Sequence, residues 1–424
     1  MTDAISTEAS ENPQEPEEKK VSPIGALRIP DFRRLWANNV AYFIAFNALR
    51  FVFSWYVLDG LNRGESEQGF AVFAIGLPGI FLLLQAGAWA DRLNPRVLLI
   101  ATQTGSILVF AGTAVLIASG RATFGWILVA AVLAGATSAV GQPVRASLVP
   151  AIVGKDNLFG AIALNALAMT TSMILGPVVV QMVGKRFDFD GAFWFLAILL
   201  LVGLVPLRSL KVPASAEPVG PKRSVWVDTK EAVRHVVADP ALRILFLLLS
   251  MAGLTVNPAV MVTLQAFVKQ ELGRDSGDAA QVFAAMGVGI AISSVVVMRK
   301  GDMANKGAAF QRAMMVGGTM TFLMGLTTEY WQLFPLAFFM GLAGGFYINM
   351  NQGLIQANTP QPLMGRVMGL YTLVQVGLMP IGALILGVIA NSFGIGNTIS
   401  AAAAIAFVIV CTTYVMGREL RALS

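Results

Sequence analysis

One basic side chain lies deep in an apolar stretch, where an unpaired charge is costly. Arg50 stands about fourteen residues into the stretch 36–58, which is ~21 Å along a helix and beyond the middle of a ~30 Å hydrocarbon core. A mid-span arginine costs at least ~2.5–3.5 kcal/mol unless it meets a partner or water. No acid stands near the middle of another apolar stretch, so Arg50 needs an explanation.

Two interpretations of Arg50 follow. In the first, the guanidinium faces a central cavity and binds an anionic or carbonyl-rich substrate group, because its geometry suits pairs of oxygen atoms. In the second, it reaches outward to Asp59 or is satisfied by backbone carbonyls and amides. Asn47 lies three residues before Arg50, on the same helix face, and would share its environment in either case.

Polar side chains inside other apolar stretches are further candidates for a cavity lining. In lipid such groups must face a neighbouring helix or a lumen, and each could equally hold two helices together. Besides Arg50, we expect substrate contacts from Asn47, Gln142, Asn165, Asn349 and Gln352.

If a substrate crosses the membrane through such a cavity, the acidic residues limit how its movement could be coupled to an ion gradient. Many proton antiporters use a carboxylate whose burial raises its pKa, and here the coupling candidates, Asp59 and Glu329, lie at the ends of apolar stretches. Sodium coupling and facilitated diffusion therefore stay open. The single histidine, His235, and single cysteine, Cys411, provide no metal cluster and no histidine-based triad. We expect no metal, no cofactor and no enzymatic activity.

The elements that must position these residues are apolar helices. The composition is 56% hydrophobic and only 13% charged, against ~25% charged in soluble domains, and the mean hydropathy is +0.69. The sequence predicts an all-α integral membrane protein with twelve transmembrane helices in two six-helix halves. The predicted spans are 36–58, 69–90, 97–119, 124–149, 159–184, 191–207, 243–268, 279–298, 310–328, 332–357, 365–391 and 396–416.

Charge and polarity along the chain set its expected organisation. Most of the 30 Lys and Arg residues fall in the N-terminal tail, the middle linker and alternate loops, which predicts that both termini are cytoplasmic. The net charge of +6 is then topological and gives no reason to expect nucleic-acid binding. The expected segments are a disordered tail 1–31, a bundle 32–207, a linker 208–242 with a helical part at 225–238, a bundle 243–417 and a tail 418–424.

Several motifs resemble the major facilitator superfamily. Gly87–Arg96 (GAWADRLNPR) has its glycine and Asp-Arg pair, although Asn94-Pro95 stands where the family has a glycine and a basic residue. Gly176-Pro177 is similar to an element of exporter branches. Three stretches are similar to the branch of enterobactin and macrolide exporters: Phe32–Trp36, Pro143-Val144-Arg145 with Leu148-Val149-Pro150, and Gly365-Arg366-Val367.

The resemblance implies a latch between the halves in an outward-facing state. Asp91 would end its helix at the inner face and meet a basic neighbour or the positive start of the helix near 365. The alternative is a turn that only fixes topology. The expected gate residues are Gly87, Asp91, Arg92, Arg96, Arg145, Gly176, Pro177 and Arg366.

The expected function is therefore export of a small organic molecule across a bacterial inner membrane by alternating access. The resemblance implies proton antiport. Uptake or facilitated diffusion of a metabolite, lipid or siderophore-like compound is the alternative within transport, and a membrane sensor or scaffold that does not transport is the alternative outside it. We expect a monomer whose partners are its substrate, membrane lipid and protons.

Overall fold

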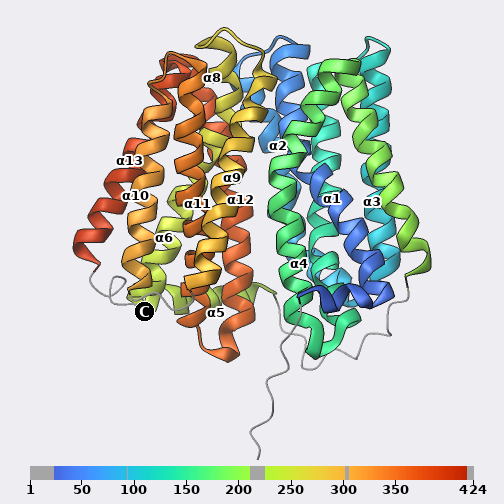
Figure 1. Cartoon of the computed structure of the whole chain (residues 1–424), viewed down its shortest axis with the longest axis vertical. Coiled ribbons are helices and arrows are strands. Elements are labelled where there is room, and N and C mark those ends of the chain that lie inside the picture. Colours follow the sequence, from blue (N-terminus) through green and yellow to red (C-terminus); the bar gives the residue numbers. More distant parts are fainter. Residues whose placement is uncertain (1–22, 93, 211–224, 301–304, 418–424) are drawn as a thin grey trace, which may run out of the picture.

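The computed structural model describes residues 23–92, 94–210, 225–300 and 305–417 (Figure 1). Within these ranges the chain forms helices and short connections, without a strand. The predicted tail 1–31 lies outside the description as far as residue 22, and so do 418–424 and the linker residues 211–224. Pro23–Arg28 forms a 3-10 helix, η1, rather than the disordered chain predicted up to residue 31. The reason is burial, because Ala26 belongs to an apolar cluster with α4 residues such as Val144.

The first group of helices begins and ends at residues suited to those positions. Pro95 stands at the start of α3, where no backbone N–H is needed, and the side chain of Asn94 accepts a hydrogen bond from the N–H of Arg96. A π-helical turn, η2 (Tyr56–Gly60), extends the first helix. The helices are α1 (Pro30–Trp55), α2 (Glu65–Arg92), α3 (Pro95–Ala118) and α4 (Phe124–Leu204), followed by η3 (Val205–Ser209).

Helix α4 is interrupted twice. Gly154 has φ 66° and ψ −178°, and Asp188 has φ 60° and ψ −175°, both outside helical geometry. The loop predicted at 150–158 is thus reduced to a break at Gly154, because the chain on either side keeps helical hydrogen bonding. A positive φ is readily adopted by glycine, which accounts for the position of this break.

The second group follows the linker. Helix α5 (Val225–Ala238) coincides with the helical part expected in the linker. Next comes one broken run: α6 (Pro240–Leu254), α7 (Val256–Pro258), the π-helical η4 (Ala259–Thr263) and α8 (Leu264–Gln270). Short 3-10 helices η5 (Ser276–Asp278), η6 (Tyr330–Gln332) and η7 (Gln361–Leu363) precede later helices. These are α9 (Ala279–Lys300), α10 (Lys306–Met324), α11 (Leu333–Ala357), α12 (Met364–Phe393) and α13 (Ile395–Met416).

The helices are those of an integral membrane protein. Among the described residues, nine helical stretches are long and apolar enough to cross a membrane. The twelve spans expected from the sequence differ from these nine chiefly because the stretch Gly160–Ser209 runs for 50 residues as one unit and because α2 and α10 are not among the nine. Large apolar side chains, such as Leu108 at 68% and Met182 at 65%, are exposed on the outer faces, as lipid contact requires.

Two groups of helices lie side by side, α1–α4 in one and α6–α13 in the other, with both ends of the described chain at the same end of the bundle (Figure 1). They meet where α2 packs on α12 and α4 packs on α9. The first contact is close, since a Cβ added at Gly76 would lie 1.9 Å from Cγ of Pro380. In the second, a Cβ added at Gly287 would lie 2.0 Å from a side-chain carbon of Ile174. Only glycine permits either approach.

Candidate functional site

A cavity of about 280 Å³ lies between the two groups of helices. This volume is close to the lower end of the range for small-molecule sites, roughly 300–1,000 Å³. Helices α1, α4, α9, α11 and α12 and the broken run α6–α8 all contribute to its wall. The lining residues are Phe46, Asn47, Arg50, Phe51, Met173, Pro177, Asn257, Met261, Phe283, Met286, Ile290, Met340, Gly341, Gly344, Tyr347, Ile348, Gln375 and Met379.

Among the described residues that line this wall, Arg50 alone carries a fixed charge. Its guanidinium carbon lies 5.4 Å from the ring centroid of Phe46, one helical turn earlier. The buried Nε has no hydrogen-bond partner, and no described acid forms an ion pair with this arginine. The carboxylate of Asp59, the outward partner considered for Arg50, pairs with Lys269 at 2.9 Å in this structure.

The other polar groups of the cavity wall come from three helices and one short turn. Asn47 donates from Nδ2 to the carbonyl of Phe43 at 2.9 Å, which leaves its amide oxygen for another donor. Asn257, Tyr347 and Gln375 also line the cavity, and the buried hydroxyl of Tyr347 has no partner among the described residues. The rest of the wall is apolar, so a ligand here would meet a cation, several neutral polar groups and a large apolar surface.

The remaining predicted substrate contacts lie away from the cavity wall. Asn165 accepts a hydrogen bond from Nδ2 of Asn39 at 3.1 Å and so joins α4 to α1. Asn349 donates to Oγ of Ser294 at 3.3 Å and joins α11 to α9. Gln142 is half-buried in α4 and Gln352 is exposed. Neither residue lines the cavity.

Polar contacts around Asp59 join the two groups of helices at the end of the bundle where α8 lies (Figure 1), which we call the closed end. This carboxylate pairs with Nζ of Lys269 at 2.9 Å. It also accepts hydrogen bonds from the hydroxyl and the N–H of Ser276, at 2.6 and 3.0 Å, and from Nε1 of Trp55 at 3.0 Å. The indole nitrogen lies 3.0 Å from the carboxylate of Asp275 as well. These contacts join residues more than 200 positions apart in the chain and tie the two groups of helices together.

A second cluster strengthens the same end. The carboxylate of Asp278 pairs with Lys185 and accepts a hydrogen bond from Gln181 at 3.2 Å. The backbone carbonyl of Asp278 accepts one from the hydroxyl of Tyr330 at 2.9 Å. Among the described residues, the hydrogen bonds that join the two groups of helices all lie in this half of the molecule.

Burial perturbs one acid of this closed end. The pKa of Asp275 is raised above its ordinary value of 3.8, chiefly because burial disfavours the charged carboxylate, and the neighbouring charges of Asp59 and Asp278 add to the effect. A hydrogen bond from the N–H of Gly277 and the charge of Lys185 act in the opposite direction. The two predicted coupling residues differ: Asp59 lies between the helix groups, whereas Glu329 is exposed and caps the turn before α11.

The predicted gate residues are spread over several places. Gly87, Asp91 and Arg92 belong to α2, but the described part of the structure covers only their place in this helix and not their contacts. Arg96 donates from Nε to the carbonyl of Leu207 at 3.2 Å, within its own group of helices. Arg366 pairs with Glu231 of α5 at 2.6 Å.

The other three gate candidates lie deeper. Arg145 is buried inside the first group of helices, donates to Oε1 of Gln103 at 2.6 Å and lies 3.6 Å above the ring centroid of Tyr42. At Gly176 an added Cβ would approach the backbone nitrogen of Ala48 within 2.9 Å, which shows close packing of α4 on α1. Pro177, next to it, lines the cavity.

Two features of the site have no counterpart in the sequence predictions. The sequence predictions do not include Lys269, Asp275 or Asp278 as site residues. Their position between two apolar stretches nevertheless places them at the same end as Asp59. The methionines of the cavity wall were also not selected: Met173, Met261, Met286, Met340 and Met379.

Comparison with known proteins agrees with this architecture. The uncharacterized MFS-type transporter YkuC of Bacillus subtilis is 24% identical over 353 residues, which is 80% of this chain and 81% of that one. The enterobactin exporter EntS of Shigella boydii is 25% identical over 258 residues, 60% of either chain. A solved structure of a POT family transporter with 5-aminolevulinic acid superimposes with a TM-score of 0.74 at 12% identity, over 92% of this chain and 96% of the other.

The chain also matches the sequence model of a whole protein family. Residues 35–383 match the family described as the Major Facilitator Superfamily. This range includes most of α1, every helix from α2 to α11 and most of α12, and it contains every residue named above as lining the cavity. The chain belongs to the Major Facilitator Superfamily and is a membrane transport protein by family and fold.

Proposed function

We propose that this chain is a secondary transporter that exports a small organic anion by alternating access. The observation that carries the proposal is Arg50, a cation without a described acidic partner on the wall of a cavity between two groups of helices. A guanidinium in such a place is stabilised when a carboxylate or phosphate enters, because charge-assisted hydrogen bonds gain strength away from water.

The proposed architecture has twelve crossings in two halves, 32–207 and 243–417, joined by the linker 208–242. Three of the crossings come from α4, which the breaks at Gly154 and Asp188 divide into segments. Helices α2 and α10, of 28 and 19 residues, supply two more. An even number of crossings agrees with both described ends lying at one end of the bundle (Figure 1). The charge distribution favours the cytoplasmic side of an inner membrane for that end.

Alternating access gives the closed end a role. In this orientation the contacts around Asp59 and Asp278 lie on the external side, so the cavity is reached from the cytoplasm. In this proposal, opening of the external side requires the pair of Asp59 and Lys269 to separate, while the opposite end closes. Asp59 is the proposed coupling residue, because its ion pair with Lys269 joins the two groups of helices.

A transport assay in everted membrane vesicles tests the proposal. Respiration acidifies the lumen, a fluorescent reporter follows the pH gradient, and organic anions, cations and neutral lipophiles are added in turn. Arg50→Gln is compared with wild type and with Arg121→Gln, a matched change at an exposed arginine between α3 and α4.

We expect anions to dissipate the gradient with wild type and Arg121→Gln, and to lose this effect with Arg50→Gln. An equal response from Arg50→Gln would contradict an anion site at that residue. A response to no compound, together with saturable anion uptake into vesicles without a gradient, would replace proton antiport by facilitated diffusion.

A further inference from the structure

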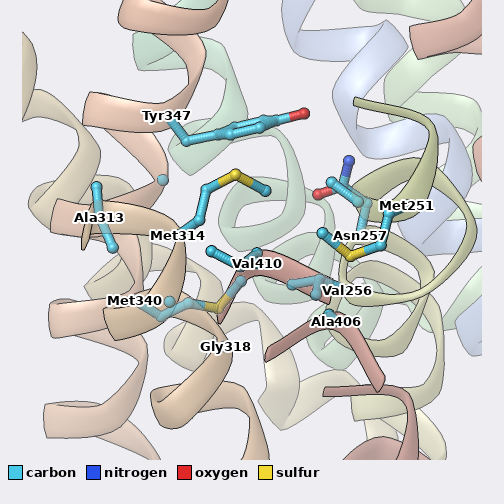
Figure 2. A pocket seen from close by; sticks show the side chains of 14 residues that line it. Met251, Val256, Asn257, Ala313, Met314, Gly318, Met340, Tyr347, Ala406 and Val410 are labelled. Atoms are coloured by element: carbon cyan, nitrogen blue, oxygen red, sulfur yellow. The ribbon is translucent and has the colours of Figure 1, made fainter. Parts of the chain in front are cut away.

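A second, smaller pocket opens beside the central cavity. It has a volume of about 60 Å³ and lies among α6, α7, α10, α11 and α13. Figure 2 shows the ring of Tyr347 along one side of it, Met314 and Met340 below the ring, and Met251 and Asn257 opposite. The remaining lining is made of small or apolar residues: Ala252, Val256, Ala313, Gly317, Gly318, Ala343, Gly344, Ala406 and Val410.

This side pocket shares part of its wall with the central cavity. Asn257, Met340, Gly344 and Tyr347 line both. The polar side-chain atoms of the side pocket, the hydroxyl of Tyr347 and the amide of Asn257, belong to these shared residues. The rest of its wall is apolar, apart from backbone groups. The pocket is therefore an apolar compartment next to the charged cavity.

The chemistry of the two compartments differs sharply. The central cavity offers the guanidinium of Arg50, which recognises an anionic group. The side pocket offers the thioethers of Met251, Met314 and Met340, which are flexible and adapt to apolar groups of varied shape. A small volume lined in this way suits a short alkyl end better than a polar group, which would find few partners there.

We propose that the ligand is an amphiphilic organic anion whose charged group meets Arg50 and whose apolar end enters this side pocket. The inference rests on the proposed function for the anion at Arg50, and it adds the substrate class. It assigns Met251, Met314 and Gly317, which line only the side pocket, to recognition of the apolar end.

The first test uses butanoate, hexanoate, octanoate and decanoate as probes, with the purified full chain in lipid nanodiscs and binding followed by calorimetry. Affinity should rise along the series by about fourfold for each methylene that becomes buried. Gly317→Val should flatten that rise, because the added side chain occupies the pocket. The substitution fits the backbone, since a Cβ at Gly317 makes only an ordinary contact, 3.5 Å from that of Ala343.

Gly353→Val is the matched control. It lies on α11, is exposed, and an added Cβ there meets nothing within 4 Å, so the chain-length dependence should stay that of wild type. A second measurement needs no variant: octanoate carrying a diazirine at its apolar end should label peptides with Met251 or Met314 on illumination. Labelling confined to lipid-facing residues would overturn the proposal.

These measurements distinguish failure of the side-pocket proposal from failure of the proposed function. If butanoate binds wild type but not Arg50→Gln, and longer chains gain nothing, the anion site stands and the side-pocket proposal fails. If octanol binds as tightly as octanoate and competes with it, the pocket belongs to a neutral lipid and the proposal also fails. If no carboxylate binds wild type, or Arg50→Gln binds them equally well, the proposed function itself fails.

Discussion

The half-buried Arg50 and the buried Arg145 of the first helix group have opposite predicted roles, and one pair of substitutions separates them. Arg50 faces the cavity and its buried Nε has no partner. Arg145 has buried nitrogens without a described partner too, Nε and Nη1, but its Nη2 donates to Gln103 and its guanidinium lies over the ring of Tyr42. We compare Arg50→Gln with Arg145→Gln, which remove the same charge from neighbouring helices.

The structure gives the expected magnitudes. A hydrogen bond to a charged group contributes about 1.5–3 kcal/mol, so Arg50→Gln should weaken octanoate binding by roughly ten- to 150-fold. Its free energy of unfolding should stay the same or rise, because loss of the 5.4 Å contact with the ring of Phe46 is outweighed when a costly charge leaves the membrane interior. Arg145→Gln should instead lower the free energy of unfolding by about 2–3 kcal/mol, through loss of the bond to Gln103 and the contact with Tyr42.

Both quantities can be measured on the same nanodisc samples. Calorimetry gives the dissociation constant for octanoate, and tryptophan fluorescence during heating reports unfolding. The reasoning is refuted if Arg50→Gln unfolds at a clearly lower temperature while its affinity is kept, since the arginine would then have a structural role. It is refuted equally if Arg145→Gln loses affinity without losing stability.

The remaining predictions concern the closed end and the contact between α2 and α12. All use a cysteine introduced on the cavity wall, with Cys411 replaced, and follow its labelling by a maleimide added from the closed side. Asp59→Asn leaves Lys269 without its ion pair and should speed labelling; an unchanged rate would mean that the pair does not hold this end closed. Gly76→Val places atoms against Pro380 and should also speed labelling by forcing the helices apart, whereas slower labelling would contradict the packing argument. Burial raises the pKa of Asp275, so its carboxyl group binds a proton more tightly when this end is closed than when it is open and hydrated. The contribution of this protonation to closure is complete below pH 3.8 and is lost as the pH rises through the raised pKa. Asp275→Asn is neutral at every pH and should therefore slow labelling at neutral pH relative to wild type, with the difference disappearing in acid. A difference in labelling rate that grows in acid would contradict this pH dependence.

The positions of the helices could be predicted from the sequence because hydropathy is a local property. The predicted span 365–391 compares with α12 at Met364–Phe393, and 279–298 with α9 at Ala279–Lys300. The prominence of Arg50 could also be predicted, since a charge far from either end of an apolar stretch is costly wherever the other helices lie.

The contacts at the closed end could not be predicted in the same way. Asp59 and Ser276 are separated by 217 positions, and their meeting depends on how the two groups of helices dock. For Asn165 and Asn349 the sequence shows only that each faces a neighbour or a lumen, and the structure shows neighbours. The methionines of the cavity give no signal either, because in sequence they are indistinguishable from other apolar residues of a span.

The central claim is that an organic anion crosses the membrane through the cavity of Arg50. Its most direct test is uptake of radiolabelled octanoate into proteoliposomes preloaded with unlabelled octanoate, for wild type, Arg50→Gln and Arg121→Gln. The account predicts saturable exchange by wild type and Arg121→Gln and none above empty liposomes by Arg50→Gln. Equal exchange by all three proteins would contradict it.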